Sequence, residues 1–216
     1  MPIKEFFRKI VFGPKASSAS YVAYLRSLGM VIGNNTMIYS PLYCTIDETR
    51  PWMIEIGSNV SITKGVTILT HGYDWSVFKG MYGEVLGSAG RVKIGDNVFI
   101  GMNSTILKGV TIGDNVVIGA NSLINKDVPS NSVVVGNPQR VVCDIDEYLE
   151  KRRAAQLDEA RDLYACWRKN SPEGKQGGCR RASCFQSFSG YSSHVDRRVC
   201  RVRHLKARCA CAERKL

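Results

Sequence analysis

A single histidine offers the clearest chemistry in the sequence. His71 is the only histidine in the first 190 residues, and it lies in the run THGYDW at residues 70–75. An imidazole accepts and donates a proton near neutral pH, so a histidine held in a cleft can act as a general base. Asp74 and Glu84 follow it, and either carboxylate can hold the ring and stabilise its protonated form. A surface histidine with satisfied hydrogen bonds is the alternative interpretation.

A six-residue repeat lies on both sides of this histidine and must position it. Isoleucine occurs at every sixth position across residues 94–124, often followed by glycine, with serine, threonine or valine four places on. An α-helix has a period near 3.6 and a strand has a period of 2, so neither explains a period of six. A coil of short flat strands does, with one aliphatic side chain of each turn inward and Gly or Asn at the bends. The repeat is less regular across residues 32–68.

The repeat breaks directly after His71. Ile68 and Ile94 are 26 residues apart, which is not a multiple of six, so a loop of about residues 72–91 leaves the coil. The loop is rich in glycine and aromatic residues, which suits an excursion that closes over a neighbouring surface. We therefore expect a cleft where the coil ends and the loop begins, with His71 in it.

The repeat resembles that of the hexapeptide-repeat acyltransferases, and the resemblance covers about residues 30–142. It implies a mainly β fold, a left-handed parallel β-helix. The closest resemblance is to maltose/galactoside-type and polysaccharide O-acetyltransferases. This implies transfer of an acetyl group from acetyl-CoA to a hydroxyl of a sugar or polysaccharide precursor, with His71 as the base. A xenobiotic (antibiotic) O-acetyltransferase and a catalytically silent β-helix assembly module are the alternatives.

The resemblance also assigns residues to the two substrates. Small residues let the pantetheine arm approach the backbone and basic residues meet the nucleotide phosphates; these are Gly101, Gly119, Ala120, Ser122, Lys126 and Arg140. Carboxylates and an aromatic side chain are assigned to the acceptor; these are Asp47, Asp74, Trp75 and Glu84. No metal is implied, since the γ-class carbonic anhydrases, which share the coil, need three histidine ligands.

The resemblance further implies a homotrimer. Apolar residues that lie off the six-residue period need cover, and a three-fold arrangement can supply it. They are Val98, Phe99, Val116, Val117 and Leu123. The acyl-CoA site would then be shared, with His71 and the loop of one subunit beside residues 94–126 of the next.

Helical segments flank the coil. Residues 1–29 contain two expected helices, at residues 4–11 and 17–28, and the second has a serine N-cap and ends at Gly29. A capping box opens a C-terminal helix over residues 143–169. The apolar side chains of this last helix are expected to pack against the coil or a second subunit.

The charge of the chain is concentrated at one end. The net charge is +11, but residues 171–216 hold eleven Lys/Arg against three Asp/Glu, so the basic character does not indicate a nucleic-acid-binding coil. No apolar run is long enough to span a bilayer, and charges interrupt the first ten residues, so a cytoplasmic protein is expected.

The tail, residues 170–216, has a composition unlike the rest of the chain. Five of the eight cysteines lie there, with two histidines: Cys179, Cys184, Cys200, Cys209, Cys211, His194 and His204. These residues suggest a zinc module or a disulfide framework, but the spacing lacks Cys-x-x-Cys pairs. A frame-altered extension that does not fold by itself is favoured. Truncation near residue 170 is then expected to leave activity unchanged.

Overall fold

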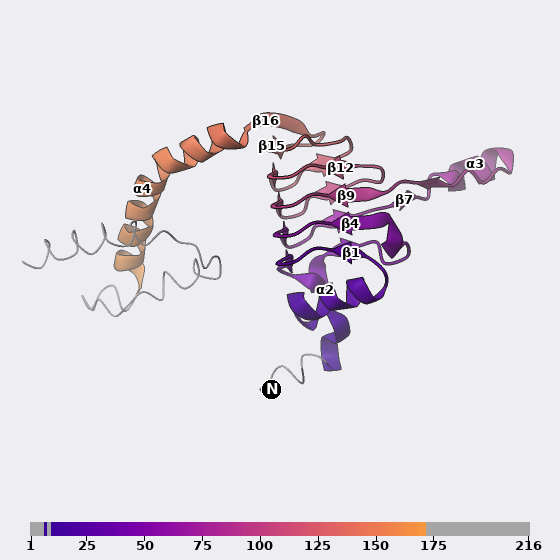
Figure 1. The fold of residues 1–216 in the computed structure, drawn as a ribbon, viewed down its shortest axis with the longest axis horizontal. Coiled ribbons are helices and arrows are strands. Elements are labelled where there is room, and N and C mark those ends of the chain that lie inside the picture. The colour runs from indigo at the N-terminus through magenta and orange to yellow at the C-terminus, as the bar shows by residue number, and fades with distance from the viewer. Residues whose placement is uncertain (1–6, 8–9, 172–216) are drawn as a thin grey trace, which may run out of the picture. The chain divides into compact units, whose positions relative to one another are not determined.

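The coil consists of short parallel strands that return to the same three sheets in turn (Figure 1). The structure is a computed structural model that describes residue 7 and residues 10–171. Sheet A contains β1 (Val31–Ile32), β4 (Ile54–Ile56), β9 (Val92–Ile94) and β12 (Thr111–Ile112). Sheet B contains β2 (Met37–Ile38), β5 (Ser61–Ile62), β10 (Phe99–Ile100), β13 (Val117–Ile118), β15 (Ser132–Val135) and β16 (Arg140–Asp144). Sheet C contains β3 (Thr45–Ile46), β6 (Thr67–Ile68), β11 (Thr105–Ile106) and β14 (Leu123–Ile124). The expected mainly β fold with parallel sheets is confirmed, and it has the arrangement of a β-helix.

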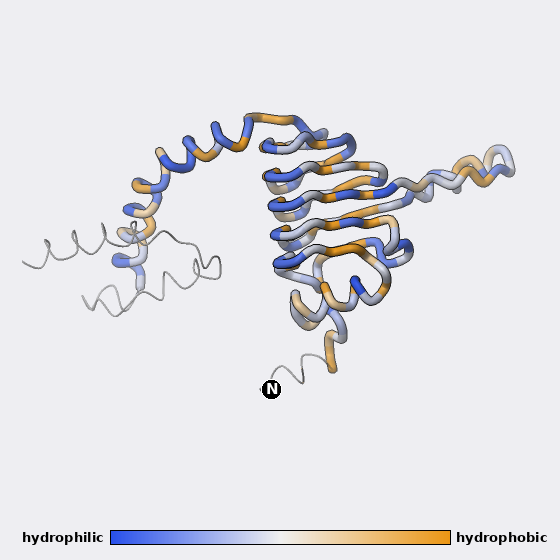
Figure 2. Tube along the Cα trace, in the orientation of Figure 1, coloured by the Kyte–Doolittle hydropathy of each residue, from blue (hydrophilic) through white to orange (hydrophobic). Residues whose placement is uncertain are grey.

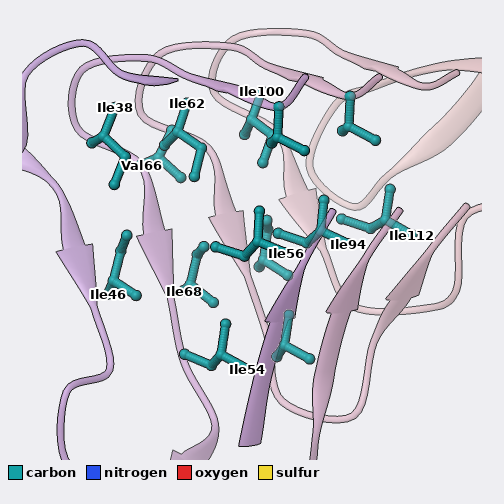
Figure 3. Close-up of a cluster of buried hydrophobic side chains, with 14 of the residues drawn as sticks. Ile38, Ile46, Ile54, Ile56, Ile62, Val66, Ile68, Ile94, Ile100 and Ile112 are labelled. Carbon is teal, nitrogen blue, oxygen red and sulfur yellow. The ribbon is translucent and has the colours of Figure 1, made fainter. Parts of the chain in front are cut away.

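Isoleucines of the repeat lie on isoleucines of the next coil, except that Ile112 and Ile118 lie on Val128 and Val134. Ile62 pairs with Ile100 and Ile100 with Ile118, so one regular coil takes eighteen residues. These side chains are fully buried, and Figure 3 shows Ile62 and Ile100 among the side chains that fill the interior. Burial of one such side chain contributes about 1.5–3 kcal/mol. The repeat therefore stabilises the coil with one isoleucine per strand.

A second inward position in each repeat is taken by valine at the corner before the strand. Buried residues at this position are Val60, Val66, Val98, Val110 and Val116. The prediction that Val98 and Val116 need cover from another subunit is therefore wrong. The backbone turns at the preceding residue, which is an asparagine or, before Val66 and Val110, a glycine, and this turn directs the next side chain inward. Phe99 stays exposed on the outside, and Val117 and Leu123 are partly buried.

Asparagine supplies most of the left-handed turns at the corners, and Gly65 and Gly109 supply two others. Seven asparagines have φ between 55° and 59°, a region that Asn enters more readily than most residues: Asn35, Asn59, Asn97, Asn103, Asn115, Asn121 and Asn131. Their side chains stack, since Asn97 Nδ2 donates to Asn115 Oδ1 at 2.9 Å and Asn115 Nδ2 to Asn131 Oδ1 at 2.8 Å. Gly57 instead permits close stacking, because a Cβ there would lie 2.6 Å from the carbonyl of Gly95.

The N-terminal part of the chain packs against the first coil. The helix α2 (Ser18–Ser27) begins at Ser17, whose side chain forms a capping box with Ser20, and it follows the 3-10 helix η1 (Gly13–Ala16). Tyr21 and Leu25 of α2 are fully buried in the core cluster. Of the helix expected at residues 4–11, residues 7, 10 and 11 are helical, and the others lie outside the described residues.

The first coil is irregular where the repeat weakens in the sequence. The 3-10 helices η2 (Pro41–Tyr43) and η3 (Pro51–Met53) lie on either side of β3. They lengthen the path between strands, so Ile46 pairs with Ile68, twenty-two residues on. Cys44 takes an inward position and is buried. These insertions decide which residues of the first coil face residues of the second.

The expected loop is a long arm, residues 71–90, with its own secondary structure. It rises on β7 (His71–Gly72), continues as the helix α3 (Trp75–Tyr82) and returns on β8 (Ser88–Ala89), antiparallel to β7. Figure 1 shows α3 standing away from the stack of coils, and Figure 2 shows apolar residues along it. None of its residues is buried. The arm therefore depends on contacts at its base.

The helix α4 (Ile145–Asn170) follows β16 and begins as expected, since Asp144 Oδ1 accepts a hydrogen bond from Glu147 N at 2.7 Å. Its apolar side chains Leu149, Leu157 and Leu163 are exposed, and their packing against the coil or a second subunit stays a prediction. No helix in the described part of the chain is long and apolar enough to cross a membrane. The cysteine-rich tail beyond residue 171 lies outside the described residues.

Candidate active site

A buried carboxylate from the first coil holds the histidine of the second. Asp47 follows β3 and His71 follows β6, and these strands are neighbours in sheet C. His71 Nδ1 lies 2.7 Å from Asp47 Oδ2, and the two side chains are only 12% and 3% exposed. A histidine that donates from Nδ1 to a carboxylate carries its lone pair on Nε2. His71 is thus oriented to accept a proton at Nε2.

Two threonines complete the surroundings of Asp47. Thr49 donates its backbone N–H at 3.0 Å and its hydroxyl at 2.6 Å to Asp47 Oδ1. Thr70 donates its N–H at 3.3 Å and its hydroxyl to Oδ2. Burial by itself raises the pKa of Asp47, but the hydrogen bonds from Thr49, Thr70 and His71 outweigh it and hold the pKa well below its ordinary value. Asp47 is therefore an ionised anchor for the imidazole.

Asp47→Asn is expected to remove a pH-dependent part of the stability. Because the folded-state pKa is lowered, the contribution of Asp47 is fully present above the ordinary aspartate value of about 3.9 and is lost as the pH falls through the folded value. Urea unfolding should give a difference between wild type and variant that shrinks as the pH falls below about pH 4. Asp158→Asn, on the exposed surface of α4, is the control. A difference that stays constant to about pH 3 would contradict the assignment.

The residues predicted to bind the acceptor have different positions in the structure. Asp74 and Glu84 were the candidates for orienting His71, but Asp47 does so, because the pairing of Ile46 with Ile68 brings it beside Thr70. Asp74 lies at the N-cap of α3 and Glu84 just after its end, both exposed.

An aromatic side chain adjoins the histidine, and a second one adjoins the first. The ring of Tyr73 meets His71 edge-on with centroids 5.0 Å apart, and Trp75 lies 6.2 Å from Tyr73. Tyr73 is 68% exposed and Trp75 is partly buried. The base of the arm therefore offers aromatic surface next to the imidazole.

The small residues assigned to acyl-CoA have a packing reason of their own. A Cβ on Gly101 would lie 2.5 Å from Ala120 N, and one on Gly119 would lie 2.7 Å from Val135 Cγ1. Ser122 is buried, donating its hydroxyl to Gly119 O at 2.7 Å and accepting from Gly136 N at 3.1 Å. Ala120 is exposed. Stacking of the coils accounts for Gly101, Gly119 and Ser122 without a ligand, and only Ala120 presents its side chain outward.

The two predicted basic residues are joined through a residue that the sequence did not single out. Gln139 Oε1 accepts from Asn125 N at 3.0 Å, and Gln139 Nε2 donates to Lys126 O at 3.0 Å. Gln139 directly precedes Arg140, so this contact draws the start of β16 to the segment of Lys126. Both basic side chains are exposed. Lys126 follows β14, two strands beyond β6 in sheet C, which places it about 10 Å from the level of His71 along the stack.

Comparisons with known proteins agree with this architecture. The family model described as bacterial transferase hexapeptide (six repeats) matches residues 91–126. Protein CapG of Staphylococcus aureus is 46% identical over 127 residues, covering 59% of this chain and 73% of CapG. The putative acetyltransferase YvoF of Bacillus subtilis is 38% identical over 128 residues, covering 59% of this chain and 68% of YvoF. The crystal structure of the hexapeptide-repeat containing-acetyltransferase VCA0836 from Vibrio cholerae aligns with a TM-score of 0.52 at 25% identity, covering 66% of this chain and 89% of that one.

The repeat, the stacked parallel sheets and these relatives together define the class of protein. The chain belongs to the hexapeptide-repeat acyltransferase family and, as a member of it, is an acetyltransferase enzyme.

Proposed function

We propose that this enzyme transfers an acetyl group from acetyl-CoA to a hydroxyl of a sugar or polysaccharide precursor, with His71 as general base. The observation that carries the proposal is the 2.7 Å contact between His71 Nδ1 and Asp47 Oδ2. It fixes the ring through one nitrogen and leaves the other to accept a proton. Asp47 is then a positioning residue, since its buried carboxylate is occupied by Thr49, Thr70 and His71.

The reaction requires one proton carrier. His71 Nε2 takes the proton of the acceptor hydroxyl while the hydroxyl oxygen attacks the thioester carbonyl of acetyl-CoA. The carbon–sulfur bond then breaks, and the thiolate of CoA takes the proton back from the imidazolium. Ionised Asp47 stabilises the imidazolium between these two steps. Every atom and charge is accounted for without a metal.

The aromatic surface at the base of the arm supports a carbohydrate acceptor. Tyr73 presents its ring beside His71, and Trp75 adjoins Tyr73. A sugar can stack its apolar face on such rings while a hydroxyl points to the imidazole. Asp74 and Glu84 are exposed and can accept hydrogen bonds from other hydroxyls. The four residues form the proposed acceptor side.

Lys126 and Arg140 form the proposed nucleotide end of the acyl-CoA site. Both are exposed on the last coils, and their segments are held together through Gln139. Two positive charges there suit the phosphates of the nucleotide. The left-handed sense of the coil and a cytoplasmic location, where acetyl-CoA is available, are part of the same proposal.

The proposed function is tested by release of free thiol from acetyl-CoA in the presence of a panel of acceptors. Sugars and oligosaccharides with free hydroxyls should give turnover above hydrolysis, and mass spectrometry of the product should show one added acetyl ester. Turnover with hydroxylated antibiotics alone would overturn the carbohydrate assignment in favour of a xenobiotic acetyltransferase. Absence of protection by acetyl-CoA in a thermal melt, together with no turnover on any acceptor, would indicate an assembly module.

We also propose that the working unit is a homotrimer with a shared site. Phe99 and Met37 are exposed on sheet B, 43% and 41%, on the outer face of the coil. An apolar outer face on the coil is covered when three copies close around one axis. His71 and the arm of one subunit would then meet the cofactor-binding residues of the next.

Mixing two inactive variants tests the shared site. His71→Ala lacks the base, and a Lys126→Ala/Arg140→Ala variant lacks the phosphate contacts. Co-refolded hybrids are expected to regain part of the activity missing from both parents, because some sites receive both intact halves. Inactive hybrids with proven mixing, or an active monomer on sizing, would contradict the shared site. A wild-type mixture treated in the same way controls for losses on refolding.

A further inference from the structure

The arm is joined to the coil by a small set of contacts at its base. Gly90 N donates to Thr70 O at 2.8 Å, at the point where the chain re-enters the coil. A Cβ on Gly90 would lie 2.6 Å from Gly109 N, so the returning strand is pressed against the corner after β11. Beyond this point the arm consists of the strands β7 and β8, which pair through two residues each, and the exposed helix α3.

Lys108 lies at that corner and reaches into the arm. It follows β11, which pairs with β6 through Ile106 and Ile68, so Lys108 lies level with Thr70 in the neighbouring coil. Its Nζ donates to Ser88 Oγ on β8. The same nitrogen lies against β7, since a Cβ on Gly72 would be 3.3 Å from it. One ammonium group on the coil therefore bonds β8 and lies close to β7.

We propose that Lys108 is a positioning residue that fixes the arm relative to the coil, so that Tyr73 and Trp75 share one acceptor with His71. The proposal rests on the proposed function for the identity of that acceptor. A ribbon of two short strands is marginal without further packing, so its direction depends on what holds its base. Lys108 is partly buried, and a hydrogen bond from its charged amino group is stronger than a neutral one.

The protection of the arm's backbone amides against hydrogen exchange gives a test that does not depend on catalysis. Hydrogen exchange of backbone amides across residues 71–90 should accelerate in Lys108→Met and in Ser88→Ala, whereas Lys108→Arg, which keeps a donor, should stay near wild type. Combining Lys108→Met with Ser88→Ala should add little to either change, because both remove the same contact. Lys93→Met, at an exposed position on sheet A, is the matched control and should leave the arm unchanged.

Kinetics separate positioning of the acceptor from binding of the donor. Lys108→Met is expected to lower kcat/KM for the acceptor by about 10-fold or more, the usual consequence of losing a charge-assisted hydrogen bond, and to change KM for acetyl-CoA less than about twofold. A larger effect on KM for acetyl-CoA, with unchanged exchange of residues 71–90, would overturn the proposal and make Lys108 a donor-binding residue. Accelerated exchange in a Lys108→Met enzyme whose wild type has no activity on carbohydrates would support the positioning role of Lys108. It would refute only the proposed acceptor.

Discussion

Replacing His71 by alanine is expected to lower the rate of acetyl transfer by about 10²–10⁴-fold, the usual cost of losing a general base. The acceptor hydroxyl must then attack with its proton still bound or lose it to water. Folding should survive, because Asp47 keeps its hydrogen bonds from Thr49 and Thr70. Thiol release measures the rate, and titration with acetyl-CoA should show nearly unchanged binding, because the predicted donor contacts lie on later coils.

His71→Asn is the matched control for the orientation of the ring. Its side-chain amide can still donate to Asp47, but it has no nitrogen that takes up a proton near neutral pH. Both variants should therefore be inactive to a similar degree, and the asparagine variant should melt closer to wild type. Retention of more than half of the wild-type thiol release in the alanine variant would show that His71 is not the base.

Ile112→Ala should destabilise the fold by about 2–5 kcal/mol, the range for truncating a buried isoleucine to alanine. Ile112 is 1% exposed, pairs with Ile94 below it and forms a bridge with Val128 above it. Neighbouring coils are fixed by these pairings, so the space left by the side chain cannot close easily. Urea unfolding monitored by circular dichroism, at a fixed protein concentration, gives the difference in the free energy of unfolding.

The neighbouring residue on the same strand supplies the control. Thr111 is exposed, so Thr111→Ala should cost less than about 1 kcal/mol. The pair thus separates the loss of core volume from any general effect of alanine in β12. Equal losses from the two substitutions would show that the inward isoleucines do not dominate the stability of the coil.

The regular part of this fold could be predicted from the sequence because period and geometry coincide there. Isoleucine at every sixth residue fits eighteen-residue coils with three sheets, and Ile100 and Ile118 pair as that period requires. The inward direction of Val98 and Val116 was missed because a count of one apolar residue per repeat ignores the corner. The turn at the preceding asparagine, and not the strand, sets their direction.

The partner of the histidine could not be predicted in the same way. Asp47 and His71 do not have the eighteen-residue spacing of the regular coils, because η2 and η3 change the length of the first coil. Only the pairing of Ile46 with Ile68 shows that Asp47 lies beside Thr70. The contact of Lys108 with Ser88 was likewise hidden, since it depends on how the arm returns to the coil. These contacts depend on insertions, and the six-residue repeat does not extend through the insertions, so it cannot predict them.

The constant spacing of strands in sheet C fixes how far apart residues on different coils lie along the stack. His71 follows β6 and Lys126 follows β14, with β11 between them, so their separation along the stack is a whole number of strand spacings. Each spacing is about 4.8 Å. One regular coil takes eighteen residues. Gain or loss of one coil between these residues would therefore change their separation by one strand spacing without altering the packing of either end. In such an architecture, the offset along the stack between the proposed base and the proposed nucleotide-binding residue changes by whole coils.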